Sequence, residues 1–328
     1  MVKDLFKFIF VAVIGLALTS CAKEVEESNR DIQERILDAY LQVNAEKWPN
    51  AKKYPSGLTI LKFKQGEGEP TYRRTAVYVD YTLQGLDGTV TETTYPEVAK
   101  RIGTYTPSEY FGPQYMEIGF NSTYKGLEEL LLMMNEGAEA TFILPPWLTY
   151  KDSLQKGNTS SQVNGLYELK CNFMIKDIVK YEKDTIQKYV RKNYIQMDTL
   201  PGGIYFKKLY ESGGDSLKTQ VAQVRYVGKL LDGFVFDTNI EDTARKYGIY
   251  NKDNDYEPLS VDCEEDFKSM AENTSLVAGF CKALLAMSVG DVAVTIFNSD
   301  YGYTYNGKDP IGPYQPLQFW LYVESAEK

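Results

Sequence analysis

Apolar and polar residues alternate in two distant stretches of the chain, residues 76–82 and 220–227. Alternation with a period of two is typical of a strand that buries one face. Residues 126–136 and 276–289 instead repeat apolar side chains three and four positions apart. This spacing predicts one short helix in each half of the chain, lying across a sheet.

Helical patterns also precede each set of strands, at residues 32–40 and 186–194. Gly137 and Gly290 follow the two short internal helices, and we expect them to be C-terminal caps. The predicted fold class is α+β: an antiparallel sheet curled around one short helix, with an additional helix at its N-terminal side, used twice.

The chain resembles itself at a fixed offset, which indicates a tandem repeat. Tyr81 lines up with Tyr226, 145 positions later, and the segments VDYTLQGLDG and VRYVGKLLDG around them match without a gap. Further on, Tyr150 lines up with Tyr303 at an offset of 153, so the second copy carries a net insertion of 8 residues. We place the insertion in the acidic stretch 263–274.

Composition excludes several kinds of chemistry. The 328 residues are 43% hydrophobic, enough for two domain cores, and the net charge of -9 without a long basic run argues against nucleic acid as a partner. The sequence has no histidine, which rules out imidazole bases and His-ligated zinc. Its four cysteines lack the spacing of a thiolate metal site, so we expect no metal and no cofactor.

The first twenty residues have the pattern of a secretion signal, with Lys3 and Lys7 before the apolar run 8–18. The run ends in Leu-Thr-Ser-Cys, which resembles the lipobox of bacterial lipoproteins and implies cleavage before Cys21 and lipidation of its thiol. Residues 21–30 form a charged tether, similar to the export signal of Bacteroidetes lipoproteins. The resemblance implies an outer membrane lipoprotein on the periplasmic or cell-surface face. Cys171, Cys263 and Cys281 lie in apolar segments, and we expect them to be buried small side chains.

Three segments in order, VRYVGKLLDGFVFD, LVAGFCKALLAMSVGDVAVTIFNSDYGY and IGPYQPLQFWLYV, resemble the FKBP-type peptidyl-prolyl isomerases. The resemblance covers almost the whole second copy, from about residue 203 to residue 325. It implies two tandem FKBP-like domains, one at 31–182 and one at 183–328. Activity is expected in the second domain only.

The resemblance also implies a site in the second copy. Four residues carry the family's catalytic positions: Tyr226, Phe236, Asp237 and Tyr303. Six more line the proline pocket: Leu259, Leu276, Val277, Phe280 as its floor, Ile311 and Phe319. Phe280 replaces the family's usual tryptophan, Leu259 a phenylalanine and Thr304 a glycine, which alters the size of the pocket.

The first copy departs further from the family. Tyr81 and Tyr150 remain, but Thr91-Glu92 replaces the Phe-Asp pair and Leu127 replaces the floor. Alignment places Cys171 at the last aromatic position. Because this pocket has lost most of its aromatic walls, we interpret the first copy as a degenerate scaffold or binding module.

The function implied is cis-trans isomerisation of proline-containing polypeptide chains, in support of folding in the cell envelope. The sequence is also compatible with two other functions. A non-catalytic FKBP-like binding or chaperone lipoprotein would keep the fold without turnover, and the 26 tyrosines are also compatible with surface glycan binding. Each copy has an additional segment, at residues 93–105 and 238–250, which we expect to form a short helix beside the pocket or a surface decoration.

Overall fold

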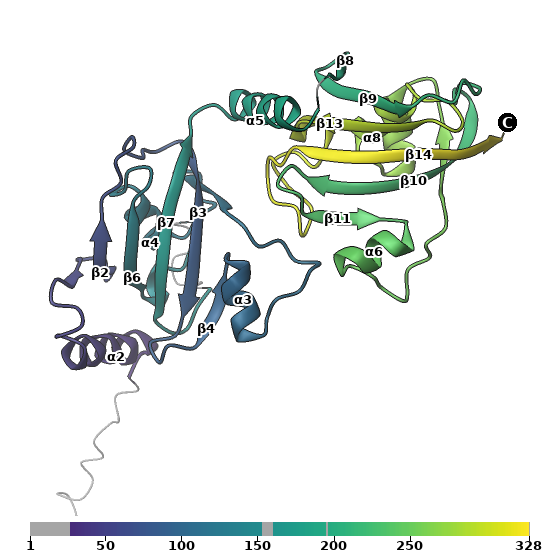
Figure 1. Ribbon diagram of the computed structural model, residues 1–328. Coiled ribbons are helices and arrows are strands. Elements are labelled where there is room, and N and C mark those ends of the chain that lie inside the picture. Colours follow the sequence, from purple (N-terminus) through teal and green to yellow (C-terminus); the bar gives the residue numbers. More distant parts are fainter. Residues whose placement is uncertain (1–26, 153–159, 195, 328) are drawn as a thin grey trace, which may run out of the picture.

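The computed structural model describes residues 27–152, 160–194 and 196–327 (Figure 1). The predicted signal peptide, Cys21 and most of the tether lie outside these residues. The first unit contains the following elements in order: α2 (Asn29–Val43), β1 (Lys52–Lys53), β2 (Thr59–Lys64), β3 (Thr75–Gln84), β4 (Val90–Thr93), α3 (Pro96–Ile102), β5 (Gln114–Ile118), α4 (Lys125–Leu131), β6 (Glu139–Leu144), the 3₁₀ helix η1 (Pro146–Leu148) and β7 (Gly165–Ile175).

The second unit repeats this order with one additional helix. Its elements are α5 (Ile178–Asn193), β8 (Asp198–Leu200), β9 (Ile204–Tyr210), β10 (Gln220–Leu230), β11 (Val235–Thr238), α6 (Glu241–Tyr247), β12 (Leu259–Cys263), α7 (Phe267–Thr274), α8 (Ala278–Leu284), β13 (Val292–Phe297), the 3₁₀ helix η3 (Ser299–Tyr301) and β14 (Leu317–Glu327). The additional helix is α7, which lies in the stretch where the repeat predicted an insertion. The short helices α3 and α6 confirm the helix predicted in each additional segment.

The two sheets have the same topology, which confirms the α+β repeat. Each has seven strands, in the order β1-β2-β6-β7-β3-β4 with β5 on β3, and β8-β9-β13-β14-β10-β11 with β12 on β10. All of these pairs are antiparallel. Even the irregularities coincide, because the register with the last strand shifts between Tyr78 and Val79 in one unit and between Gln223 and Val224 in the other.

The short helix inside each unit, α4 in the first and α8 in the second, is shorter than the sequence predicted. α4 ends at Leu131 and α8 at Leu284, and one turn of i→i+3 hydrogen bonds follows each. The prediction that Gly137 and Gly290 cap these helices was wrong. Both glycines have positive φ, 81° and 85°, and lie in the turns that enter β6 and β13, where the left-handed backbone favours glycine.

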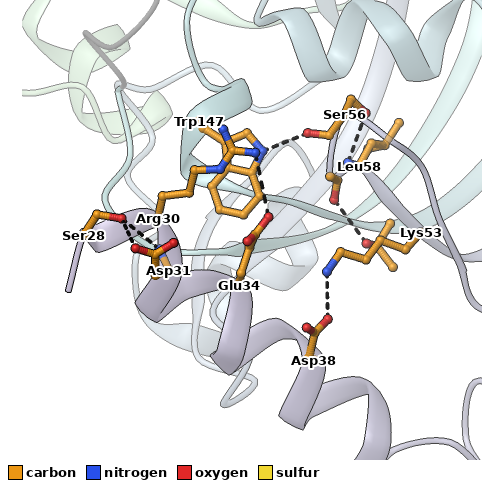
Figure 2. Close-up of polar contacts among 11 residues, drawn as sticks. Ser28, Arg30, Asp31, Glu34, Asp38, Lys53, Ser56, Leu58 and Trp147 are labelled. Atoms are coloured by element: carbon orange, nitrogen blue, oxygen red, sulfur yellow. Dashed lines mark hydrogen bonds and ion pairs between the residues drawn. The ribbon is translucent and has the colours of Figure 1, made fainter. Parts of the chain in front are cut away.

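Helix α2 packs against the outer face of the first sheet, where Leu37 contacts Leu61, Ile143 and Leu166. Polar contacts hold its N-terminus and its middle, as Figure 2 shows. Ser28 accepts a hydrogen bond from the Asp31 backbone N–H, and the Lys53 ammonium lies 2.7 Å from the Asp38 carboxylate. The Arg30 guanidinium lies 4.9 Å from the centroid of the Trp147 ring, whose Nε1 donates to the Ser56 carbonyl at 2.8 Å.

Helix α5 joins the two units and packs against both. Its first turn, with Ile178 and Tyr181, covers a first-unit cluster that contains Tyr78. Further along, Ile186 and Val190 pack on the second sheet. Alternation predicted β3 to be half-buried, but its first five residues are buried. The reason is that Ala76 and Tyr78 pack in the cluster under α5, while Val77 and Val79 pack in the first-unit core. The domain boundary predicted at residue 183 falls inside this helix.

Buried Glu182 on α5 holds the start of the η3 helix. Its two carboxylate oxygens accept from the Ser299 backbone N–H at 2.8 Å and from the Ser299 hydroxyl at 2.9 Å. Burial raises the pKa of Glu182, although these two hydrogen bonds oppose the shift. A raised folded-state pKa means that the native protein binds this proton more tightly than the unfolded chain does, so stability falls as the pH rises through that pKa.

We therefore expect Glu182→Gln to raise the melting temperature more at pH 7 than at pH 4. The amide keeps both contacts, because its oxygen can accept from the Ser299 N–H and its NH₂ group can donate to the hydroxyl, but it no longer carries a charge to desolvate. Thermal unfolding of both proteins at the two pH values measures the difference. Equal gains at both pH values would contradict the assignment of a buried charge.

The three cysteines of the described residues, Cys171, Cys263 and Cys281, are free and buried, which confirms their prediction as small core side chains. Burial raises the pKa of each thiol to about 11. Within the ranges that the structure describes, no helix is long and apolar enough to cross a membrane.

Candidate active site

An aromatic cluster lies between the second sheet and α8. Phe319 of β14 is its centre: its ring centroid lies 5.3 Å from that of Phe280 and 5.7 Å from that of Phe236, both in edge-to-face geometry, and 6.3 Å from that of Tyr226. Tyr226 also meets Phe280 edge-to-face, at 5.9 Å. Phe280 and Phe319 are buried, whereas Tyr226 and Phe236 are half-buried. The half-buried rings of Tyr226 and Phe236 thus present part of this aromatic cluster to solvent.

Asp237 is the anionic group of this cluster. It follows Phe236 on β11, is itself exposed, and accepts a hydrogen bond of 2.9 Å from the Tyr226 hydroxyl. Burial raises the pKa of Tyr226, and the charge and hydrogen bond of Asp237 raise it further. The phenol therefore stays protonated, and the pair places one carboxylate at the edge of an otherwise apolar surface.

Tyr303 follows the η3 helix and packs against the same cluster. Its ring lies 5.3 Å from the Lys308 ammonium. Burial, followed by the charge of Asp237, raises the pKa of Tyr303, so its hydroxyl is a hydrogen-bond donor at neutral pH.

Aliphatic side chains complete the surface. All of the predicted site residues except Asp237 belong to one hydrophobic cluster. Asp237 contacts this cluster through its hydrogen bond with Tyr226. The predicted site residues not yet described are Leu259, Leu276, Val277 and Ile311. Nine of the ten predicted side chains thus belong to the hydrophobic core of the second unit, on β10, β11, β12, α8, β14 and the loops beside them. Their roles in catalysis remain a prediction.

Sequence reasoning missed two members of the site. A Cβ atom at Gly228 would lie 2.6 Å from Phe236 and 2.9 Å from Phe319, so only glycine allows these rings to approach β10. Phe297 stacks on Phe319, with the two ring centroids 5.9 Å apart and an interplanar angle of 11°. The sequence did contain a signal for Gly228, because the first unit has Leu83 at the corresponding position.

Thr304, at a position where the resembling family has glycine, has a φ of 55°. The left-handed region disfavours a β-branched residue by about 1–2 kcal/mol. We expect Thr304→Gly to raise the unfolding free energy by about 0.5–1 kcal/mol, because the greater unfolded-state entropy of glycine offsets part of the relief. Thermal denaturation checks this, with Asn306→Gly in the same loop as a control that should not stabilise. A loss of stability in Thr304→Gly would contradict it.

The first unit keeps the corresponding arrangement in part. Tyr81 donates a hydrogen bond to Glu92, as Tyr226 does to Asp237. The placement of Cys171 at the last aromatic position was wrong, because Cys171 pairs with Val79 while Tyr167 pairs with Leu83. Since Phe319 pairs with the equivalent Gly228, Tyr167 holds the aromatic position. The first unit has therefore lost less of its aromatic wall than its sequence suggested.

The described residues contain no group of three or more His, Cys, Asp or Glu side chains that could hold a metal ion. What the second-unit site offers is an apolar aromatic surface, one carboxylate and tyrosine hydroxyls. These groups can bind and hydrogen-bond a neutral ligand, but nothing among them is an activated nucleophile.

Comparison with known proteins agrees with this chemistry. The family model of FKBP-type peptidyl-prolyl cis-trans isomerase matches residues 214–323. A short-type peptidyl-prolyl cis-trans isomerase of Methanocaldococcus jannaschii is 37% identical over 70 residues, which cover 21% of this chain and 44% of the relative. The chain thus spans less than half the length of that curated relative. Residues 214–323 are therefore the part of the chain that is similar to the FKBP-type family.

Solved structures with similarity include a peptidyl-prolyl cis-trans isomerase from Pseudomonas syringae, with a TM-score of 0.34, 23% identity, and coverage of 46% of this chain and 94% of that one. FkpA from Escherichia coli has a TM-score of 0.33 and 18% identity, covering 46% of this chain and 62% of its own. The three FKBP domains of wheat FKBP73 give a TM-score of 0.29 and 16% identity, covering 83% and 95%.

Proposed function

We propose that the second unit catalyses cis-trans isomerisation of the peptide bond before proline in polypeptide chains. The observation that carries this proposal is the aromatic cluster around Phe319, with the Tyr226–Asp237 pair at its edge, inside the segment that matches the FKBP-type family. The first unit acts as a binding module. The substrates are unfolded or partly folded chains that expose proline.

The chemistry requires no nucleophile. Rotation about a peptide bond must cross a barrier of about 18–20 kcal/mol because twisting sacrifices amide resonance. A pocket that binds the twisted imide more tightly than the planar one lowers that barrier. Phe236, Phe280 and Phe319 would hold the proline ring away from water, and Tyr303 would donate a hydrogen bond to the substrate carbonyl. A thousandfold acceleration needs about 4 kcal/mol, within reach of aromatic burial and one or two hydrogen bonds.

The test is a proline-isomerisation assay on the protein from Glu24 onward, with a short chromogenic peptide that contains one proline. Acceleration above the uncatalysed rate supports the proposal. Cooperative unfolding together with no acceleration would favour the alternative, a non-catalytic binding or chaperone protein. The assay separates the two because chaperone binding alone leaves the isomerisation of a short peptide unchanged.

We further propose that the protein works in the cell envelope, anchored through a lipid on Cys21 to the outer membrane. This proposal is supported by the signal pattern of the first twenty residues and the four-residue motif that ends in Cys21. It places the isomerase among chains that fold after export.

Removal of the lipidation site should release the protein from the membrane. We expect Cys21→Ser to appear in the soluble envelope fraction, whereas the parent sediments with membranes, because the apolar run 8–18 is too short for a confident membrane span. Cell fractionation followed by immunoblotting measures this, with Glu26→Gln in the tether as a control that stays membrane-bound. Continued sedimentation of Cys21→Ser would refute lipid anchoring.

A further inference from the structure

The first unit contains a cavity of about 510 Å³ at the position that corresponds to the second-unit site. Tyr81, Glu92, Leu127 and Tyr167 line it. In the sheet register and the repeat, these four residues are the equivalents of Tyr226, Asp237, Phe280 and Phe319. Its volume lies within the range of ligand pockets, about 300–1,000 Å³.

One wall of this cavity comes from the second unit. Tyr305 and Pro313 of the η3–β14 connection line it together with the first-unit residues. The connection is fixed to the first unit beside the cavity, since the Tyr314 ring lies 5.3 Å from that of Tyr115 and the Gln315 amide donates to the Tyr78 hydroxyl at 3.2 Å. Figure 1 shows this connection at the side of the second unit that faces the first.

The same connection carries Tyr303 and Ile311 of the proposed isomerase site. The two sites therefore share one segment of chain, Tyr303 and Ile311 turning toward the second-unit cluster and Tyr305 and Pro313 toward the first-unit cavity. A second contact holds the units together: the Tyr110 hydroxyl donates to Asp232 at 2.9 Å, and its ring meets Phe234 edge-to-face at 5.4 Å.

The lining favours a polypeptide as ligand. Five tyrosines surround the cavity, namely Tyr81, Tyr115, Tyr124, Tyr167 and Tyr305. Tyrosine offers a large, rigid apolar face and a hydroxyl at low conformational entropy cost, the combination that protein surfaces use to bind other chains. Leu127, Leu169 and Met116 provide an apolar floor for a side chain. Glu92, Glu117 and Lys151 add charged groups that can hydrogen-bond an exposed backbone.

We propose that this composite cavity binds an extended segment of the same unfolded chain whose prolines the second unit isomerises. A chain held at the first unit has its other segments at high effective concentration near the second site. The benefit depends on length, because a peptide of four residues occupies only one site at a time. The kinetic readout of this inference rests on the proposed isomerase function.

The experiment uses the protein from Glu24 onward and compares two substrates. One is a chromogenic tetrapeptide with one proline, and the other is a reduced, carboxymethylated protein whose refolding is limited by prolyl isomerisation. Ser122→Trp adds a bulky side chain at an exposed position of the cavity lining, and Tyr305→Ala removes the wall that the second unit supplies. Tyr210→Ala is the matched control. Tyr210 is 61% exposed and Tyr305 is 65% exposed, but Tyr210 lies on β9 and does not line the cavity.

Tyr305→Ala loses one aromatic contact, and Ser122→Trp obstructs the cavity. We expect each variant to lower kcat/KM for the protein substrate about three- to tenfold, with the tetrapeptide rate unchanged. Tyr210→Ala should match the parent on both substrates. Parent-like efficiency of both cavity variants on the protein substrate would overturn the inference. So would an equal loss on both substrates, since it would place these residues in the isomerase site.

Binding keeps the inference testable if the parent proves inactive on the tetrapeptide, a result that would refute the proposed isomerase function alone. Isothermal titration with reduced, carboxymethylated α-lactalbumin should then give a Kd about three- to tenfold weaker for Ser122→Trp than for the parent. An unchanged Kd would overturn the inference.

Discussion

Phe236→Thr combined with Asp237→Glu should lower kcat/KM for a proline tetrapeptide roughly tenfold to a hundredfold. This double variant copies Thr91 and Glu92 of the first unit. It removes a ring that packs edge-to-face on Phe319 at 5.7 Å. Loss of the apolar contact between this half-buried ring and a bound proline corresponds to about 2–3 kcal/mol of transition-state binding. It also adds one methylene group to the side chain whose carboxylate accepts a hydrogen bond from Tyr226. The chromogenic isomerisation assay measures the change.

The control for this variant is its fold, because Phe236 belongs to the hydrophobic cluster of the second unit. Circular dichroism and thermal unfolding should resemble those of the parent. Tyr303→Phe keeps the ring and removes only the hydrogen-bond donor. It should lower kcat/KM roughly fivefold, which corresponds to about 1 kcal/mol of transition-state binding. If the double variant stays folded and isomerises proline at the parent rate, the aromatic cluster is not the active site.

Dividing the chain between β7 and α5 should place nearly all of the isomerase activity in one fragment. We expect residues 177–328 to retain the tetrapeptide activity and residues 27–176 to show little. The first unit has a threonine in place of Phe236, a leucine in place of Phe280, and Leu83 in place of the Gly228 that admits the rings. The first unit therefore lacks two of the rings that would exclude water from the imide.

The fragment comparison requires that both pieces fold. Each unit has its own seven-stranded sheet and central helix, so each should unfold cooperatively. The division exposes Tyr78 and Phe173, which pack against Tyr181 of α5, and the first fragment should lose some stability. Equal activity in two folded fragments would show that the Phe236 and Phe280 positions do not distinguish the units.

The sequence by itself determined the repeat and the α+β class, and it supplied the prediction of the second-unit site. These follow from features that are local or repeated along the chain: periodicities of two and three to four, a constant offset between Tyr81 and Tyr226, and motifs in family order. Each is a property of neighbouring residues or of two copies compared in register. The helix α7 was foreseeable as an insertion for the same reason.

Only the tertiary structure decided which residues meet across strands and between units. Tyr167, not Cys171, stands opposite Leu83 because strand pairing sets that register, and the length of the preceding loop differs between the copies. The need for glycine at position 228 depends on two rings from other strands. The cavity wall supplied by Tyr305 and Pro313 depends on how the units pack. Contacts between residues far apart in the chain leave no periodic trace in it, and for that reason they were visible only in the folded protein.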